Sequence, residues 1–191
     1  MALFKEIIID ADFCIKVGAS VKYRYLEKLL PLLASKVYLH KIVFDEILTP
    51  SSAVEQVNTL INQGLVKIID VDDLNSLDRN IYQSTYASLA TVMINPNNPG
   101  KNQGEVRSLA MAKTKSIPYF VTDERNLQPI IDKILNTGIN DITCIRINDI
   151  IMQIKLGEIT GFSRKEAKVL WVIAGKKKAI FDEVIWPISD L

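Results

Sequence analysis

The chain has 191 residues, of which 48% are hydrophobic, 24% charged and 7% aromatic. These fractions are typical of a globular protein that can bury a sizeable core, and they predict one domain by default. Lysine and arginine number 23 against 22 aspartates and glutamates, which leaves a formal net charge of +1. This balance excludes a protein with a polybasic tail and a strongly acidic, solvent-exposed protein. Any anionic partner must therefore bind to a local patch of positive charge.

The sequence gives no sign of a membrane segment or of a disulfide framework. No run of about 18 apolar residues occurs, and Glu6 interrupts the opening residues, so we expect neither a membrane span nor a signal peptide. Cys14 and Cys144 are far apart and lack a CxxC partner, which argues against disulfides and a cysteine zinc site and favours a cytoplasmic location. His40 is the only histidine, so carboxylates are the expected carriers of any chemistry.

The first half of the chain alternates short apolar runs with helical patterns. The run EIIID at 6–10 is typical of a buried parallel strand. Leucines at helical spacing predict a helix at 23–33, a strand follows near 37–39, and a short helix ends before Pro50. Ser51 or Ser52 is expected to cap a helix that reaches about residue 62 before Gly64, and 66–71 is another strand candidate.

The second half continues the alternation. The pattern predicts one or two helices at 72–91, a loop at 95–100, a helix at 104–115, a strand at 117–122, a helix at 127–135, a strand at 142–145 and a helix from Asp149. Ser163 is expected to cap a last helix that reaches Ile173, and the residues after about 157 form an added lobe or a final helix with an edge strand. The fold class is therefore α/β, a three-layer sandwich with a mostly parallel central sheet and helices on both faces.

Four acids stand out by their positions. Asp10 and Asp123 each come directly after a predicted strand, where ligands collect in parallel sheets. Glu46 shares a helix face with the apolar Ile42, and Glu105 lies in the first turn of a predicted helix. Each acid alone has an ordinary explanation as a helix cap or a salt-bridged surface residue. Together they indicate a site for a bound cation. Carboxylate oxygens are hard ligands, which are those that Mg2+ and Mn2+ select.

The order of these acids resembles that of the PIN-domain nucleases. The matching segments are IIIDADFCIKV at 7–17, HKIVFDEIL at 40–48, GEVRSLAMA at 104–112 and PYFVTDERN at 118–126. The resemblance covers about residues 5–147, with His40 standing where the family usually has serine. It implies a PIN-like nuclease domain at 1–147, with 148–191 as a C-terminal helical extension packed on the same domain.

The resemblance also implies an activity, which is cleavage of RNA, commonly single-stranded, with Mg2+ or Mn2+. By position, the catalytic and metal-binding acids would be Asp10, Glu46, Glu105 and Asp123, and the neighbouring Glu124 is an alternative fourth ligand. Asp12 lies where the family often has asparagine and would support the site indirectly. Small nucleases of this family pair with an antitoxin, so a protein inhibitor is one expected partner. The extra C-terminal residues could equally shape a homodimer or a substrate groove.

Residues around the predicted site are candidates for contact with RNA. Thr122 is placed to hydrogen-bond a carboxylate or a phosphate, and Lys101, Arg107 and Arg125 surround the predicted mouth. These three cations could hold a phosphate backbone or simply be solvated surface. The lysine run at 176–178 could touch RNA, but a solvated helix end is the expected role. For Trp171 and Trp186, packing in the core is expected over stacking on bases.

Two other functions remain open. The segment IIIDADF is also similar to the opening of haloacid-dehalogenase-type phosphohydrolases, in which Asp10 would be the nucleophile and Asp12 an acid. That interpretation needs a later lysine and leaves Glu46 and Glu105 unexplained. A PIN-like module that binds RNA or a protein without cutting is the non-enzymatic alternative.

Overall fold

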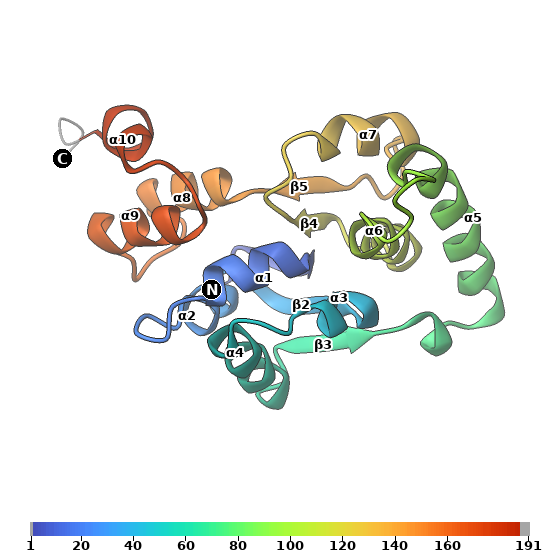
Figure 1. Ribbon diagram of the computed structural model, residues 1–191, viewed down its shortest axis with the longest axis horizontal. Helices are drawn as coiled ribbons and strands as arrows, with labels where there is room; N and C mark the ends of the chain where they lie inside the picture. The colour runs from blue at the N-terminus through green and yellow to red at the C-terminus, as the bar shows by residue number, and fades with distance from the viewer. Residues whose placement is uncertain (1, 188–191) are drawn as a thin grey trace.

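The computed structural model describes residues 2–187 and contains a central five-stranded sheet in the order β3-β2-β1-β4-β5 (Figure 1). All strand pairs are parallel, which confirms the predicted α/β class. The strands are β1 (Phe4–Ile9), β2 (Ala34–His40), β3 (Val66–Ile69), β4 (Tyr119–Val121) and β5 (Thr143–Ile145).

Helices connect the strands and cover both faces of the sheet. They are α1 (Ala11–Gly18), α2 (Tyr25–Leu33), α3 (Lys41–Glu46), α4 (Ser51–Asn62), a 3-10 turn η1 (Val71–Asp73), α5 (Ser76–Met93), α6 (Gln103–Lys115), α7 (Leu127–Ile134), α8 (Ile147–Lys155), α9 (Arg164–Ile173), α10 (Lys178–Ile180) and a π-helical turn η2 (Phe181–Ile185). No helix within residues 2–187 is both long and apolar enough to cross a membrane.

The isoleucine run of β1 divides the interior into two layers. Successive strand side chains point to opposite faces, so Ile7 and Ile9 pack in one cluster while Ile8 packs in the other. The first cluster includes buried residues of α1, α2, α4, α8 and α9, and the second includes those of α5, α6 and α7. The sheet between these two apolar layers makes a three-layer sandwich, as the alternating sequence predicts.

Two predicted helix starts need correction. Neither Ser51 nor Ser52 caps α4, because Pro50 holds the cap position and the Ser52 hydroxyl instead donates a hydrogen bond to the Gly18 carbonyl at 2.7 Å. Helix α8 begins at Ile147, two residues before the predicted Asp149. In α4, a tertiary partner competes with the local capping signal of the serine. In α8, the acid Asp149 lies in the first turn of the helix and does not mark its start.

The predicted cap of α9 is correct. The Ser163 hydroxyl oxygen accepts a hydrogen bond from the Glu166 amide at 3.2 Å, and the Glu166 carboxylate accepts from the Ser163 amide at 2.9 Å. This reciprocal pair is a capping box, which satisfies two amides that the helix itself leaves unpaired. The sequence was sufficient to predict this cap because Ser163 and Glu166 lie within four residues of each other.

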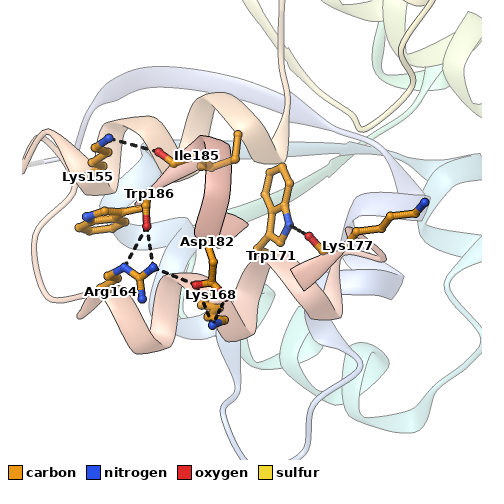
Figure 2. A network of polar contacts seen from close by, with 8 residues as sticks. All are labelled: Lys155, Arg164, Lys168, Trp171, Lys177, Asp182, Ile185 and Trp186. Carbon is orange, nitrogen blue, oxygen red and sulfur yellow. Dashed lines mark hydrogen bonds and ion pairs between the residues drawn. The ribbon is translucent and has the colours of Figure 1, made fainter. Parts of the chain in front are cut away.

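The chain after α9 forms helical turns, so the alternative of a final edge strand is wrong. Gly175 has a positive φ of 79° and reverses the chain before α10 and η2. Figure 2 shows how this segment is tied to α9: Arg164 and Lys168 both reach Asp182, at 2.9 and 2.7 Å. Trp171 and Trp186 are buried in the same apolar cluster as the sheet residues, which confirms their predicted packing role.

Candidate carboxylate site

Asp10 is the buried acid of the site. It follows β1, begins α1 as its N-cap residue and is only 5% exposed. Its backbone amide donates to the Val121 carbonyl at 3.0 Å, which joins it to the end of β4. The Thr122 hydroxyl donates to the Asp10 carboxylate at 3.3 Å, so Thr122 takes the first of its two predicted roles, as the partner of a carboxylate.

The electrostatic environment of Asp10 disfavours its charge. Burial, followed by repulsion from Glu105 and more weakly from Asp12, raises the pKa of Asp10 from its ordinary 3.8 to about 7, although hydrogen bonds from the Ala11 backbone and the Thr122 hydroxyl act in the opposite direction. Asp10 is therefore partly protonated near neutral pH. A nearby cation would stabilise the charged form.

Glu46 ends helix α3 and lies against the start of α6. A Cβ atom placed at Gly104 would stand 3.0 Å from Glu46 Oε2 and 3.3 Å from Oε1, so the carboxylate rests against the α6 backbone beside Glu105. Partial burial and the charge of Glu105 raise the pKa of Glu46. Glycine at position 104 is what permits this close approach.

Glu105 therefore links the other two carboxylates, because its charge acts on both Asp10 and Glu46. Within residues 2–187, none of these three side chains forms an ion pair with a lysine, arginine or histidine. Three of the acids predicted from the sequence thus interact electrostatically and have no ion-pair partner, although Lys16 interacts with Asp10 at longer range. We call Asp10, Glu46 and Glu105 the carboxylate site.

Asp123 has a different environment. Its carboxylate forms an ion pair with Lys176 at 2.6 Å and lies 3.9 Å from Lys16, and its side chain is 8% exposed. Lys16 also pairs with Asp12, which is exposed on α1, at 2.5 Å. Lysines from α1 and from the C-terminal segment therefore compensate the charge of Asp123.

Glu124, the alternative fourth acid, lies on the other side of the same loop. Its side chain is exposed, and its amide donates to the Thr122 hydroxyl at 3.2 Å. Glu124 lines a hollow of about 220 Å3 together with Glu105 and Lys101, both predicted site residues. Arg125 instead lines a larger cavity on the side of Asp123. The loop after β4 thus directs successive side chains to two different hollows.

Arg107 does not join this arrangement. Its guanidinium lies over the ring of Tyr86, 5.1 Å from the centroid, between α6 and α5. Burial first, and then the charge of Arg107, lowers the pKa of His40 to about 4 against the opposing effect of Asp70.

His40 has a structural role at the start of α3. Its Nδ1 accepts a hydrogen bond from the Ile42 amide at 3.2 Å, and its Nε2 lies 3.4 Å from the Tyr82 hydroxyl. A neutral imidazole with Nδ1 as acceptor carries its proton on Nε2. His40 is thus neutral at pH 7, and both of its nitrogens are engaged, as expected for a strand-end residue that is not a general base.

Sequence reasoning missed three residues that shape the site. Lys176 was assigned to solvent, and nothing in the lysine run indicates that its first member pairs with Asp123. Arg146 directly follows β5, the same strand-end position that identified the acids, so this signal could have found it. Gly104 precedes Glu105 within the helix, where a glycine without a turn indicates close approach of another group.

The donor chemistry of the site suits a hard divalent cation. Carboxylate oxygens without a cationic partner are the ligands that Mg2+ and Mn2+ prefer. In the described part of the chain, no three histidine, cysteine, aspartate or glutamate side chains are gathered closely enough to enclose a metal ion. No protein-family model, curated protein or solved structure matches this chain.

Proposed function

We propose that the chain is a PIN-like endoribonuclease that hydrolyses phosphodiester bonds of single-stranded RNA with Mg2+ or Mn2+. The observation that carries the proposal is that the charge of Glu105 raises the pKa of both Asp10 and Glu46, while none of the three has an ion-pair partner among the described residues. Uncompensated carboxylates of this kind are unfavourable unless a cation neutralises them.

Asp10, Glu46 and Glu105 would hold the ion. Glu124 is the better fourth candidate, because it shares a hollow with Glu105, whereas Asp123 is already paired with Lys176. When bound, a divalent ion activates a water molecule and neutralises charge on the phosphoryl oxygens. No nucleophilic side chain is needed for this reaction.

The protein's own groups prepare the site for that chemistry. Thr122 fixes the orientation of the Asp10 carboxylate through its hydroxyl hydrogen bond. Asp10 must lose its proton to bind a cation, so Mn2+ affinity should rise with pH up to the metal-free pKa of about 7. Lys101 lines the hollow beside Glu105 and is placed to hold a phosphate of the substrate.

The test is a titration of Mn2+ with a labelled single-stranded RNA, followed by addition of EDTA. We expect cleavage that EDTA stops and that Asp10→Asn and Glu105→Gln each reduce by about two orders of magnitude or more, because each removes a metal ligand. Glu158→Gln is the matched control, since Glu158 is exposed on the turn after α8 and belongs to neither hollow. Equal activity of all four proteins would contradict the proposal.

A second substrate distinguishes the alternatives. Hydrolysis of p-nitrophenyl phosphate without RNA cleavage would indicate a phosphohydrolase with Asp10 as nucleophile. Binding of RNA without cleavage at any Mn2+ or Mg2+ concentration would indicate a binding module.

A further inference from the structure

A cavity of about 740 Å3 lies between the loop after β4 and the C-terminal segment. Its polar lining consists of one acid, four cations and one amide: Asp123, Arg125, Arg146, Lys176, Lys177 and Asn148. Its apolar lining includes Trp171, Ile180 and Ile185. The volume falls within the range of roughly 300–1,000 Å3 that is typical of sites for small molecules.

The cavity has an excess of positive charge. Asp123 compensates Lys176, with which it pairs at 2.6 Å. No ion pair between described residues involves Arg125, Arg146 or Lys177. Three cations with no acidic partner therefore surround a concave surface, an arrangement that attracts an anion.

The backbone holds two of these cations in place. Arg146 donates from its guanidinium to the carbonyls of Arg125 at 2.9 Å and Glu124 at 3.3 Å, and these neutral partners leave its charge uncompensated. The Lys177 carbonyl accepts a hydrogen bond from the Trp171 indole at 2.9 Å. Figure 2 shows the Lys177 side chain extending away from this contact. The Arg146 guanidinium is thus positioned before any ligand arrives, whereas for Lys177 only the backbone is fixed.

The cavity also adjoins the carboxylate site. Asp123 lines it, and Asp123 directly follows Thr122, the hydrogen-bond partner of Asp10. The next residue, Glu124, lines the hollow of Glu105 and Lys101. Consecutive residues of one loop thus line the two hollows, so a single flexible RNA strand could contact both.

We propose that this cavity binds one nucleotide of single-stranded RNA next to the bond that is cut, with Arg125, Arg146 and Lys177 on the phosphate and the Trp171, Ile180 and Ile185 surface against the base. The inference rests on the proposed function. It adds a specific subsite, built jointly by the loop after β4, the start of α8 and the segment after α9.

The test measures binding in EDTA, where cleavage does not interfere. A labelled single-stranded oligoribonucleotide is titrated with the parent protein and with the double variant Arg125→Gln, Lys177→Gln. The matched control is Lys67→Gln, Lys133→Gln, which removes two exposed lysines of β3 and α7 that line neither hollow. We expect about tenfold weaker binding and a salt dependence reduced by roughly 1.4 for the cavity variant alone, because two phosphate contacts are lost. Thermal melts of both variants check that the fold is retained.

Competitors identify the ligand chemistry. Inorganic phosphate at millimolar concentration, a duplex RNA of the same length and an acidic peptide should each compete poorly. Competition by phosphate or by the acidic peptide as strong as by unlabelled oligonucleotide would overturn the proposal, as would equal affinity of the two double variants.

The two proposals fail in different ways. A parent protein that binds through the cavity but never cleaves RNA with Mn2+ would refute the nuclease and keep the nucleotide site. A parent that cleaves, with KM and salt dependence unchanged in the cavity variant, would refute the nucleotide site and keep the nuclease.

Discussion

Asp10 and Asp123 follow the ends of two neighbouring strands, yet their surroundings are opposite. Each follows the end of a buried parallel strand within one or two residues, β1 for Asp10 and β4 for Asp123. Asp10 has a raised pKa and no ion-pair partner, whereas Asp123 pairs with Lys176 and lies near Lys16. Strand topology therefore sets where an acid lies, and distant segments decide whether its charge is compensated.

The comparison predicts opposite effects when each acid is neutralised. Removing a carboxylate that is repelled by its neighbours relieves strain in the metal-free protein. Removing one that pairs with a lysine leaves that lysine without its partner.

The largest effect should come from Asp10→Asn in the absence of metal. The folded-state pKa of about 7 exceeds the ordinary 3.8, so the folded parent binds a proton more tightly than the unfolded chain and loses stability as pH rises between these values. The variant does not lose stability in this way. Its free energy of unfolding, relative to that of the parent, should therefore increase by about 2–3 kcal/mol between pH 5 and pH 8. Denaturant unfolding in EDTA at the two pH values measures it.

Manganese should reverse that advantage. The ion binds only the folded parent and raises its melting temperature, whereas Asp10→Asn should show little increase. Asp12→Asn is the control, because Asp12 is exposed and paired with Lys16. A metal-free Asp10→Asn protein that melts below the parent, with its full manganese shift retained, would show that Asp10 is an ordinary structural acid.

Asp123→Asn should change stability in the opposite direction, by about 2 kcal/mol of destabilisation, because the pair with Lys176 is largely shielded from solvent. A double-mutant cycle with Lys176→Gln isolates the coupling between the two side chains. The exposed pair of Lys41 and Asp45 provides the reference cycle, for which about 0.5 kcal/mol or less is expected. Equal coupling in both cycles would mean that burial adds nothing to the Asp123 pair.

Removing the proposed fourth metal ligand should have a smaller effect, which is measured as a change in Mn2+ affinity. Glu124→Gln should weaken Mn2+ binding by about tenfold, or about 1.4 kcal/mol, whereas Asp123→Asn should change it less, because Lys176 already occupies Asp123. Isothermal titration calorimetry of both variants decides between them. A loss confined to Asp123→Asn would assign the ligand to the residue that directly follows Thr122.

The smallest effect should come from Gly104→Ala. The added methyl group would stand 3.0 Å from Glu46 Oε2, so the Glu46 carboxylate must shift from its position. We expect about threefold weaker Mn2+ binding with little change in thermal stability, because alanine favours the helix and offsets the crowding. If Glu46 takes no part in the site, manganese affinity should be unchanged by this substitution and by Glu46→Gln.

The sequence was sufficient wherever the deciding contacts were local or periodic. Alternating apolar runs predicted the parallel sheet, and strand ends predicted the positions of Asp10 and Asp123. The capping box at Ser163 and Glu166 was predictable because both of its members lie in one turn.

Contacts between distant segments were not predictable from local patterns. Ser52 was expected to cap α4, but it bonds to Gly18, and Lys176 was expected in solvent, but it pairs with Asp123. Arg107 was expected at the mouth of the site, but it lies over Tyr86. In each case, a partner from another element outweighs the local preference, and a single sequence carries no record of that partner.

The burial of Trp171 and Trp186 gives the protein a built-in optical reporter. The chain has only these two tryptophans, and both lie in the segment from α9 to the residue after η2. Intrinsic tryptophan fluorescence therefore observes this segment alone, whereas far-ultraviolet circular dichroism observes helices and strands throughout the chain. Coincident melting curves would mean that the segment and the sheet unfold as one cooperative unit. An earlier fluorescence transition would mean that the C-terminal segment, with the cavity that it lines, opens before the carboxylate site is lost.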